Sequence, residues 1–228
     1  MNVNLNLVYN NIPMSHTGKV QNPSYRPKLQ KDIVAFTKTK ELSKEEKIAN
    51  FIKKLRKPVQ EADNVELLRT AGMLEKYDPI HDVIVLNHYN QPNKDVRWSD
   101  LGVDENNFFK QVAVIDGSAS FRESNVTNLG RLEIINGDAD FMESPLKDLG
   151  NLRYVGGTID CRFSKIEDLR NLEYVGKDAY FVSSPIEDMG NIKKVGGRAV
   201  LNGLEEYYDY EGMSFTKKIF KALSKLVK

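Results

Sequence analysis

The stretch LGNLRYVGGTIDCRFSKIEDLRNLEYVGKDAYF, from Leu149 to Phe181, repeats one pattern after twenty residues. The spacing continues on both sides, so that residues 111–210 divide into five units of twenty without an insertion. Self-similarity at a fixed period of this size indicates a solenoid, in which stacked coils share a core that one coil cannot form alone. Residues 111, 131, 151, 171 and 191 are therefore taken as position 1 of each unit.

Six apolar columns support this prediction. Positions 2, 5, 9 and 11 are apolar in all five units, and positions 16 and 19 are apolar in the first four. Positions 9 and 11 alternate with polar residues, which predicts a short strand with one face inward, and stacking aligns these strands into one parallel sheet. Serine recurs at position 14, where it can satisfy backbone groups as the chain leaves the strand. The glycines at positions 6 and 7 are expected to form a corner with positive φ.

The pattern A-x-F-x-x-S-x-(V/L/I)-x-x-L resembles the leucine-rich repeat, with serine in place of the usual asparagine or cysteine. The segment LGNLRYVGG is similar to the N-L-x-x-I-G-G turn of receptor L-domain coils. The resemblance covers about residues 111–205 and extends to uncharacterised repeat proteins of gut bacteria. It implies an α/β, leucine-rich-repeat-like solenoid with one parallel sheet of short strands.

The flanking sequences differ from the repeats, and a solenoid must cover its two open ends. Phe108 and Phe109 are suited to plug the first coil, and Trp98 is assigned to the same cap. We expect an extended or disordered segment over 1–30, a helical N-terminal module over 31–97, the cap over 98–110, the five repeats over 111–210, and a C-terminal amphipathic capping helix over 211–228.

The C-terminal segment allows two interpretations. Its apolar residues share one face of a helix and its lysines line the other, which suits either an end cap or an interfacial membrane helix. A cap explains the apolar stripe but does not require so many lysines. The candidate membrane or partner residues are Phe215, Lys217, Lys218, Phe220, Lys221 and Lys225.

No catalytic constellation stands out. The single cysteine, Cys161, lies in the aromatic column and is expected to pack in the core, because a buried free cysteine behaves as a small hydrophobe. His81 precedes Asp82, but no serine or cysteine motif accompanies the pair. Neither a phosphate-binding loop nor an H-E-x-x-H zinc motif is present. We therefore predict a protein that is not an enzyme and that has no cofactor and no metal.

Function is instead expected on the outward strand positions 8, 10 and 12. Column 10 places Asp140 beside Asp160, a pair that suits either a cation or a solvated face on which Arg162 is the counter-ion. The predicted role is recognition of a protein partner by this face, which is expected to be the inner strand face of the solenoid, the usual binding surface of such proteins. The candidate contacts are Asp138, Asp140, Asp160, Arg162, Asp178 and Tyr180.

Charge is zoned along the chain, with basic ends (1–60 and 211–228) and an acidic middle, although the net charge is only +1. The basic segment at residues 53–57 has no interleaved aromatic residues, which disfavours nucleic acid as a partner. No secretion signal or apolar run long enough to span a membrane is visible, so a cytoplasmic location is expected. Export by another route and attachment to a membrane surface stay open as alternatives.

Overall fold

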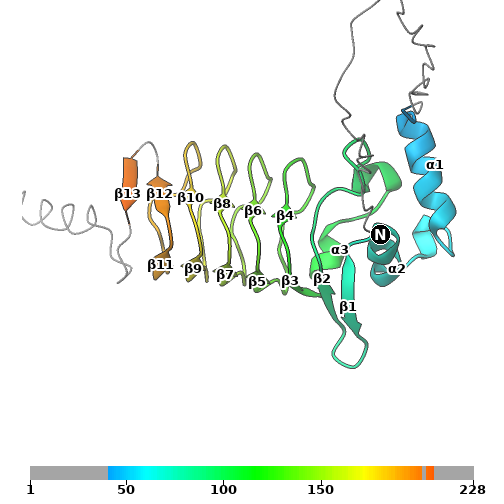
Figure 1. The fold of residues 1–228 in the computed structure, drawn as a ribbon, viewed down its shortest axis with the longest axis horizontal. Coiled ribbons are helices and arrows are strands. Elements are labelled where there is room, and N and C mark those ends of the chain that lie inside the picture. The colour runs from blue at the N-terminus through cyan, green and yellow to red at the C-terminus, as the bar shows by residue number, and fades with distance from the viewer. Residues whose placement is uncertain (1–40, 202–203, 208–228) are drawn as a thin grey trace, which may run out of the picture. The chain divides into compact units, whose positions relative to one another are not determined.

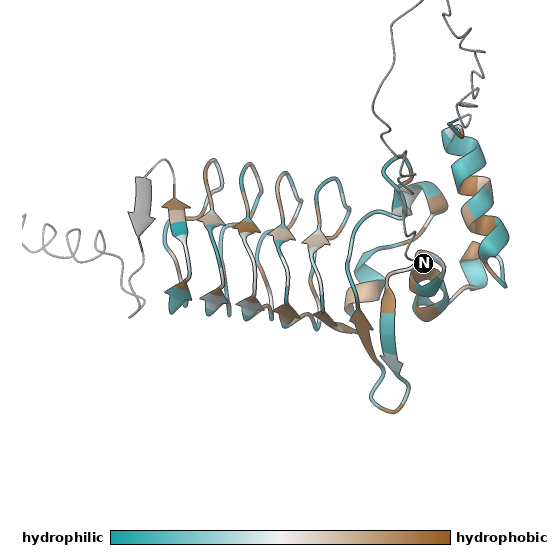
Figure 2. Cartoon of the chain, viewed as in Figure 1, coloured by the Kyte–Doolittle hydropathy of each residue, from teal (hydrophilic) through white to brown (hydrophobic). Residues whose placement is uncertain are grey.

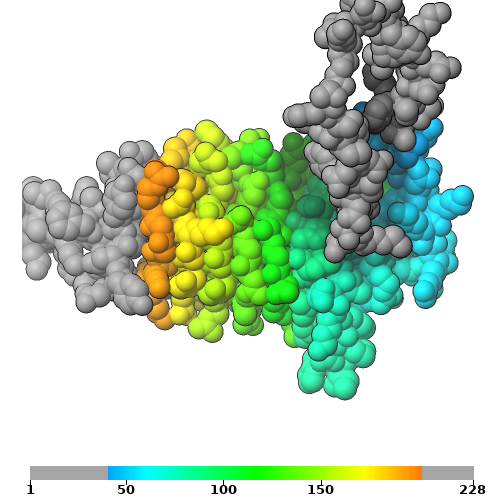
Figure 3. Space-filling model, in the orientation of Figure 1, coloured from blue at the N-terminus to red at the C-terminus, as the bar shows by residue number. Residues whose placement is uncertain are grey.

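The computed structural model describes residues 41–201 and 204–207, which lie within one compact unit that begins at Glu41. Twenty-residue coils stack on one another through the repeat region, as predicted from the period (Figure 1). In Figure 3 these coils form successive layers that run from green to orange along the chain. The described part of the chain is therefore built on a parallel β-solenoid.

Each coil contributes to two sheets. The first sheet has the order β1-β2-β3-β5-β7-β9-β11, and the second has the order β4-β6-β8-β10-β12-β13. The first consists of β1 (Leu74–Asp78), β2 (Val83–Leu86), β3 (Val112–Ile115), β5 (Ile134–Ile135), β7 (Tyr154–Val155), β9 (Tyr174–Val175) and β11 (Lys194–Val195). The second consists of β4 (Ala119–Ser120), β6 (Ala139–Asp140), β8 (Ile159–Asp160), β10 (Ala179–Tyr180), β12 (Arg198–Leu201) and β13 (Leu204–Tyr207).

The prediction of a single sheet is wrong. The expected strands at positions 9 and 10 form the second sheet, but positions 4 and 5 also pair between coils and form most of the first. The amides of Arg153 and Tyr154, for example, both donate to the carbonyl of Glu133, over 2.9 and 3.2 Å. The apolar columns around these strands are positions 2 and 5, which lie three residues apart and lack the two-residue alternation that positions 9 and 11 show, so position 5 indicated only an apolar column.

The core follows the predicted columns. In the described coils, the residues at positions 2, 5, 9, 11, 16 and 19 are buried almost throughout. Phe121 and Phe141 stack with their ring centroids 4.7 Å apart and their planes 11° apart. Cys161 and Phe181 follow them in the same column and are fully buried. The predicted file of residues at position 11 is therefore present, with the cysteine between two phenylalanines.

The serine column has the expected role in three coils. The hydroxyls of Ser124, Ser164 and Ser184 donate to the carbonyl three residues earlier, over 2.6 to 2.8 Å. Each bond satisfies a carbonyl at the point where the chain leaves the second sheet. Within the described residues, the hydroxyl of Ser144 is buried without a hydrogen-bond partner.

The corner glycines are needed for a different reason from the one predicted. Gly156, Gly176 and Gly196 do not have positive φ. A Cβ on any of them would lie well inside 3.0 Å of the carbonyl oxygen twenty residues earlier, a separation that real Cβ atoms essentially never show. Glycine is therefore required here because neighbouring coils approach closely. Positive φ occurs instead at position 13 and at position 20, where the residues are Gly130, Gly150, Arg170 and Gly190.

The recurring carboxylates at position 18 turn the chain into that last corner. Asp148, Asp168 and Asp188 each accept a hydrogen bond from the backbone amide two residues later, over 2.6 to 2.9 Å. Such a local bond favours the left-handed turn at position 20. These aspartates therefore have a structural role at the corner.

The described residues before the repeats form a short mixed segment. It contains α1 (Lys44–Lys54), the 3₁₀ helix η1 (Val59–Glu61), α2 (Asn64–Thr70) and the antiparallel pair β1–β2. Hydrophilic and hydrophobic residues alternate along α1 in Figure 2, and a capping box between Ser43 and Glu46 begins the helix. Strand β2 pairs in parallel with β3, so the first sheet continues from this segment into the solenoid.

Aromatic residues cap the first coil. The 3₁₀ helix η2 (Trp98–Leu101) and the helix α3 (Asn106–Phe109) bring the buried Trp98 and Phe108 rings to a centroid distance of 4.8 Å. Phe109 packs against Phe121 of the first coil at 5.5 Å. The predicted plug is thus present, and it continues the core of the coils toward α1.

Candidate functional site

The candidate contacts gather on the outer face of the second sheet. The backbone register pairs Asp140 with Asp160 and Asp160 with Tyr180, so these residues lie in one row across β6, β8 and β10. Their neighbours Ala139, Ile159 and Ala179 point inward and are buried. The alternation of buried and outward side chains therefore places the predicted row on the surface.

Arg162 is held rigidly at the centre of this row. Its Nε and one terminal nitrogen donate to the two carboxylate oxygens of Asp160, over 2.9 and 2.6 Å. The guanidinium carbon also lies 5.4 Å from the centroid of the Tyr180 ring, a cation–π distance. The hydrogen bond to Asp160 raises the pKa of Arg162 above its ordinary value. Arg162 thus stays charged in a fixed position between an acid and an aromatic ring.

Asp138 and Asp178 tie one coil to the next. Asp138 Oδ1 accepts from the amide of Thr158, and Asp178 Oδ1 accepts from the amide of Arg198, each over 2.8 Å. The hydroxyl of Tyr180 donates to the other oxygen of Asp178 over 3.0 Å. The backbone bond from Arg198 and then the Tyr180 bond lower the pKa of Asp178. Both carboxylates therefore have structural partners.

The remaining carboxylate, Asp140, accepts from the amide of Met142 over 2.9 Å and lies 3.7 Å from Nε of Arg122. Within residues 41–201 and 204–207, no group of three or more acidic, histidine or cysteine side chains is arranged to hold a metal ion. The expected row of acids is thus interleaved with arginines. The solvated face with Arg162 as a counter-ion describes the geometry better than a cation site.

Phe163 is a surface residue that was not among the sequence-predicted contacts. It occupies position 13, where the neighbouring coils have Glu123, Glu143 and Ser183, and 59% of its surface is exposed. Its φ is +56°, in the left-handed region that is costly for a bulky side chain. The available signal was one apolar residue in an otherwise polar column. Phe163 follows Arg162 directly in the chain and presents an exposed ring at the corner after the strand.

Cys161 is buried as predicted, and burial raises the pKa of its thiol well above the ordinary value, with the charges of Asp160 and Asp140 adding to the effect. A protonated, inaccessible thiol is a poor nucleophile. His81 is bonded to Asp78, with Nδ1 2.7 Å from the carboxylate, and not to a nucleophile. The predicted residues of the C-terminal helix lie outside the described residues.

Glu105 is a buried acid that sequence reasoning did not single out. It is 1% exposed and accepts from the Tyr89 hydroxyl at 2.8 Å, from the Gln91 amide at 3.1 Å and from the Asn125 backbone amide at 2.8 Å. Burial next to this carboxylate raises the pKa of Tyr89 well above its usual value. The three donors make Glu105 a joint between the cap and the first coil.

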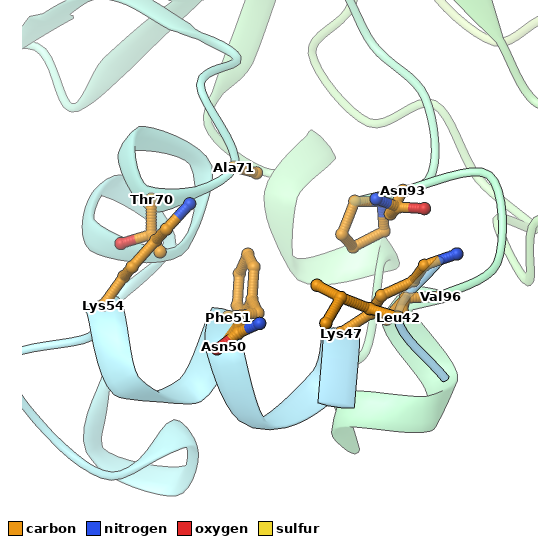
Figure 4. A pocket seen from close by; sticks show the side chains of 10 residues that line it. Leu42, Lys47, Asn50, Phe51, Lys54, Thr70, Ala71, Asn93 and Val96 are labelled. Atoms are coloured by element: carbon orange, nitrogen blue, oxygen red, sulfur yellow. The ribbon is translucent and has the colours of Figure 1, made fainter. Parts of the chain in front are cut away.

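A groove of about 280 Å³ lies beside α1. Figure 4 shows Phe51 between Lys47 and Lys54, with Thr70 and Asn93 on the facing segments. Lys47 forms an ion pair with Asp95, so part of the positive charge is already balanced. No sequence motif marked this groove, because its walls come from separate segments. The lining residues are Leu42, Lys47, Asn50, Phe51, Lys54, Thr70, Ala71, Pro92, Asn93 and Val96.

The comparisons with known proteins found no match from which a role for these residues could be inferred. No family model matches the chain, and no curated protein or solved structure is significantly similar to it. Among residues 41–201 and 204–207, no helix combines the length and the hydrophobicity that a bilayer crossing requires.

Proposed function

We propose that this protein is a non-enzymatic interaction module that binds a protein partner through the outer face of the second sheet. The observation that carries the proposal is the Arg162 cluster, in which Asp160 and Tyr180 fix Arg162, together with the exposed ring of Phe163 next in the chain. Arginine and aromatic residues dominate the binding energy of protein interfaces. The carboxylate of Asp160 and the ring of Tyr180 fix the arginine before a partner arrives, which lowers the entropy lost on binding.

The residue type at position 163 supports the same role. Glu123, Glu143 and Ser183 have the same positive φ, so the corner and not the ring sets this backbone conformation. What distinguishes Phe163 is a large exposed ring that recovers little free energy by burial, and an exposed aromatic group is a common contact residue. The flanking carboxylates of Asp138, Asp140 and Asp178 would then set orientation and disfavour acidic partners.

The proposal includes the resemblance to leucine-rich repeats, a class of solenoids that bind through stacked strand faces. The six strands of the second sheet span only ~24 Å, so the face is small beside a standard interface of ~800 Å² on each partner. A partner would therefore extend onto neighbouring corners, among them the one that carries the exposed ring of Phe163. Action in the cytoplasm is part of the same proposal, supported by the single free and buried Cys161.

Replacing Phe163 with asparagine separates binding from folding. Asparagine tolerates positive φ, so F163N should be as stable as the wild type or more stable, yet it should lose the partner. E143N is the matched control, because Glu143 has the same backbone conformation one coil earlier, with φ +57°. A photo-crosslinking amino acid at Val182, which lies on this face, reports capture of a partner from the native host extract.

Unlabelled wild-type protein and E143N should compete away the crosslinked adduct, whereas F163N and R162A should not. Competition by F163N and R162A at wild-type strength would show that the face has been assigned wrongly. An adduct yield at Val182 no higher than at Lys147, on a different corner, would lead to the same conclusion.

A further inference from the structure

The outer face of the first sheet carries a second organised row, unrelated to the proposed partner site. Tyr154 and Tyr174 stack with ring centroids 4.8 Å apart and planes 2° apart, and the ammonium of Lys194 lies 5.6 Å from the Tyr174 centroid. Tyr154 is 38% exposed although it stands in the middle of a sheet. Ile134 and Val114 continue the row on β5 and β3, where both are partly exposed. The row is therefore an aromatic and aliphatic stripe on the surface.

Charges beside this stripe alternate in sign from coil to coil. Position 3 is Glu133, Arg153, Glu173 and Lys193 in four successive coils. Glu173 lies between its two neighbours, 2.8 Å from Arg153 and 2.5 Å from Lys193. These side chains are only partly buried, with exposed fractions of 58% for Arg153, 31% for Glu173 and 72% for Lys193. They can therefore meet an opposing surface as well as one another.

The order minus, plus, minus, plus is self-complementary when it is reversed. A two-fold axis parallel to the strands and centred between β7 and β9 places Arg153 opposite Glu173 of a second copy, and Glu133 opposite Lys193. The same operation places Tyr154 opposite Tyr174. A two-fold along the solenoid axis, or a slip by one coil, would instead oppose like charges, which is unfavourable. The pattern therefore favours the centred antiparallel register, which forms four opposite-charge pairs, whereas a slip by two coils forms only two.

The geometry of the stripe suits a flat, face-to-face contact. The two tyrosine rings are parallel within 2°, and strands β5, β7, β9 and β11 pair without a register shift, so the charges follow the order of the coils along the stack. Four coils by five residues give a footprint of ~300 Å² on each copy. An interface of this size supports weak, concentration-dependent association and not an obligate dimer.

We propose that the first sheet is a self-association surface, through which two copies of this chain pair antiparallel over β5, β7, β9 and β11. The proposal does not depend on the function assigned to the second sheet, and the two outer faces can be occupied at the same time. Pairing would present two copies of the Arg162 cluster on opposite sides of the dimer, which would strengthen binding to a partner with repeated sites.

Sedimentation velocity of the full-length protein, from micromolar to several hundred micromolar, tests the proposal. The wild type should shift from monomer to dimer with concentration. R153E sets a new carboxylate opposite Glu173 twice at the two-fold and should weaken dimerisation at least tenfold. The double swap R153E/E173R restores both cross-interface pairs and should return dimerisation to within about threefold of the wild type. K147E, the same charge change on a corner, should have no effect.

The double swap also separates pairing between copies from pairing within one chain. Within a chain it creates new like-charge neighbours, because the introduced glutamate lies beside Glu133 and the introduced arginine lies beside Lys193. An intrachain role therefore predicts no rescue. A wild type that stays monomeric at all concentrations, or a double swap as defective as R153E, would overturn the proposal.

Two further measurements accompany the sedimentation series. Circular dichroism of each variant verifies the fold. A mixture of I134C and K194C that crosslinks with a short bismaleimide better than either variant alone would support the antiparallel register, because the two-fold places residue 134 of one copy opposite residue 194 of the other and offsets identical residues by three coils, ~14 Å. Equal crosslinking of the single variants and the mixture would contradict that register.

Discussion

Replacing Gly176 with alanine tests the close approach of neighbouring coils. Gly176 has no positive φ, but an added Cβ would overlap the carbonyl oxygen of Gly156 in the preceding coil. Relief of the overlap must pull the coils apart where Gly176 donates to Val155 over 2.8 Å and Lys177 donates to Gly157 over 3.0 Å. Loss of two hydrogen bonds at about 1 kcal/mol each, with about 1–3 kcal/mol of overpacking, predicts a destabilisation of about 3–5 kcal/mol.

Gly150 provides the matched comparison. Its φ is +55°, but the nearest atom to an added Cβ is Asp148 Oδ1, at 3.9 Å. G150A therefore incurs only the left-handed penalty of about 1–2 kcal/mol, partly offset by about 0.4–1 kcal/mol from a less flexible unfolded chain. We expect a net loss of about 1 kcal/mol. K177A, at an exposed site next to Gly176, should change stability by less than about 0.5 kcal/mol.

Urea unfolding followed by far-ultraviolet circular dichroism measures the three variants on one scale. The expected order of destabilisation is G176A, then G150A, then K177A. If G150A proved more destabilising than G176A, backbone conformation and not coil contact would be the reason for the corner glycines, and the packing argument would fail. Solenoids can unfold in parts, so the dependence of the unfolding free energy on urea concentration must be the same in all variants before their free energies are compared.

Three other predictions concern single features. Cys161 should resist thiol-specific reagents at pH 8 in the native state and react fully in urea, because its pKa is raised by burial; fast native labelling would contradict the buried position. Asp178 has a lowered pKa, so the stability it contributes is present above about pH 4, its unfolded value, and is lost as the pH falls through the folded value. Stability of D178N should therefore vary less below about pH 4 than that of the wild type, and equal acid sensitivity of the two proteins in urea titrations would contradict this. If residues 214–228 form the predicted interfacial membrane helix, the full chain should float with liposomes and a folded 1–210 truncation should not. Equal flotation of the two proteins would exclude the membrane interpretation.

The sequence predicted those parts of the fold that repeat every twenty residues. Each apolar column occurs in four or five copies, so the assignment of Phe121, Phe141 and Cys161 to one buried file did not depend on any single residue. The role of serine at position 14 followed for the same reason. The first sheet escaped detection because the apolar columns around its strands, positions 2 and 5, are three residues apart and do not show the alternation of a half-buried strand. The reason for the corner glycines was predicted wrongly, because the distance between neighbouring coils leaves no signal in the local sequence.

The candidate site was predictable in position but not in chemistry. Alternation along the strand placed Asp140 and Asp160 on the surface correctly. It could not show that Asp178 binds the next coil through the amide of Arg198, because such contacts depend on rotamers. Phe163 was overlooked because recurring residues guided the prediction, whereas its significance lies in departing from the column. Functional residues in a repeat protein are expected where the repeat is broken, since a residue that every coil shares is explained by the fold.

The two outer faces differ in the order of their charges, and we propose different kinds of partner for them partly on this ground. On the second sheet, a two-fold centred on β8 would bring Asp160 opposite itself, and one centred between β6 and β8 would bring it opposite Asp140 of a second copy. Self-pairing in these two registers would set acid against acid, which disfavours them. On the first sheet the alternation of charges at position 3 makes the reversed copy complementary. Because the coils are stacked in sequence order, the order of charges along the chain is also their order along the surface. Comparing that order with its reverse therefore shows whether two antiparallel copies would oppose like or opposite charges.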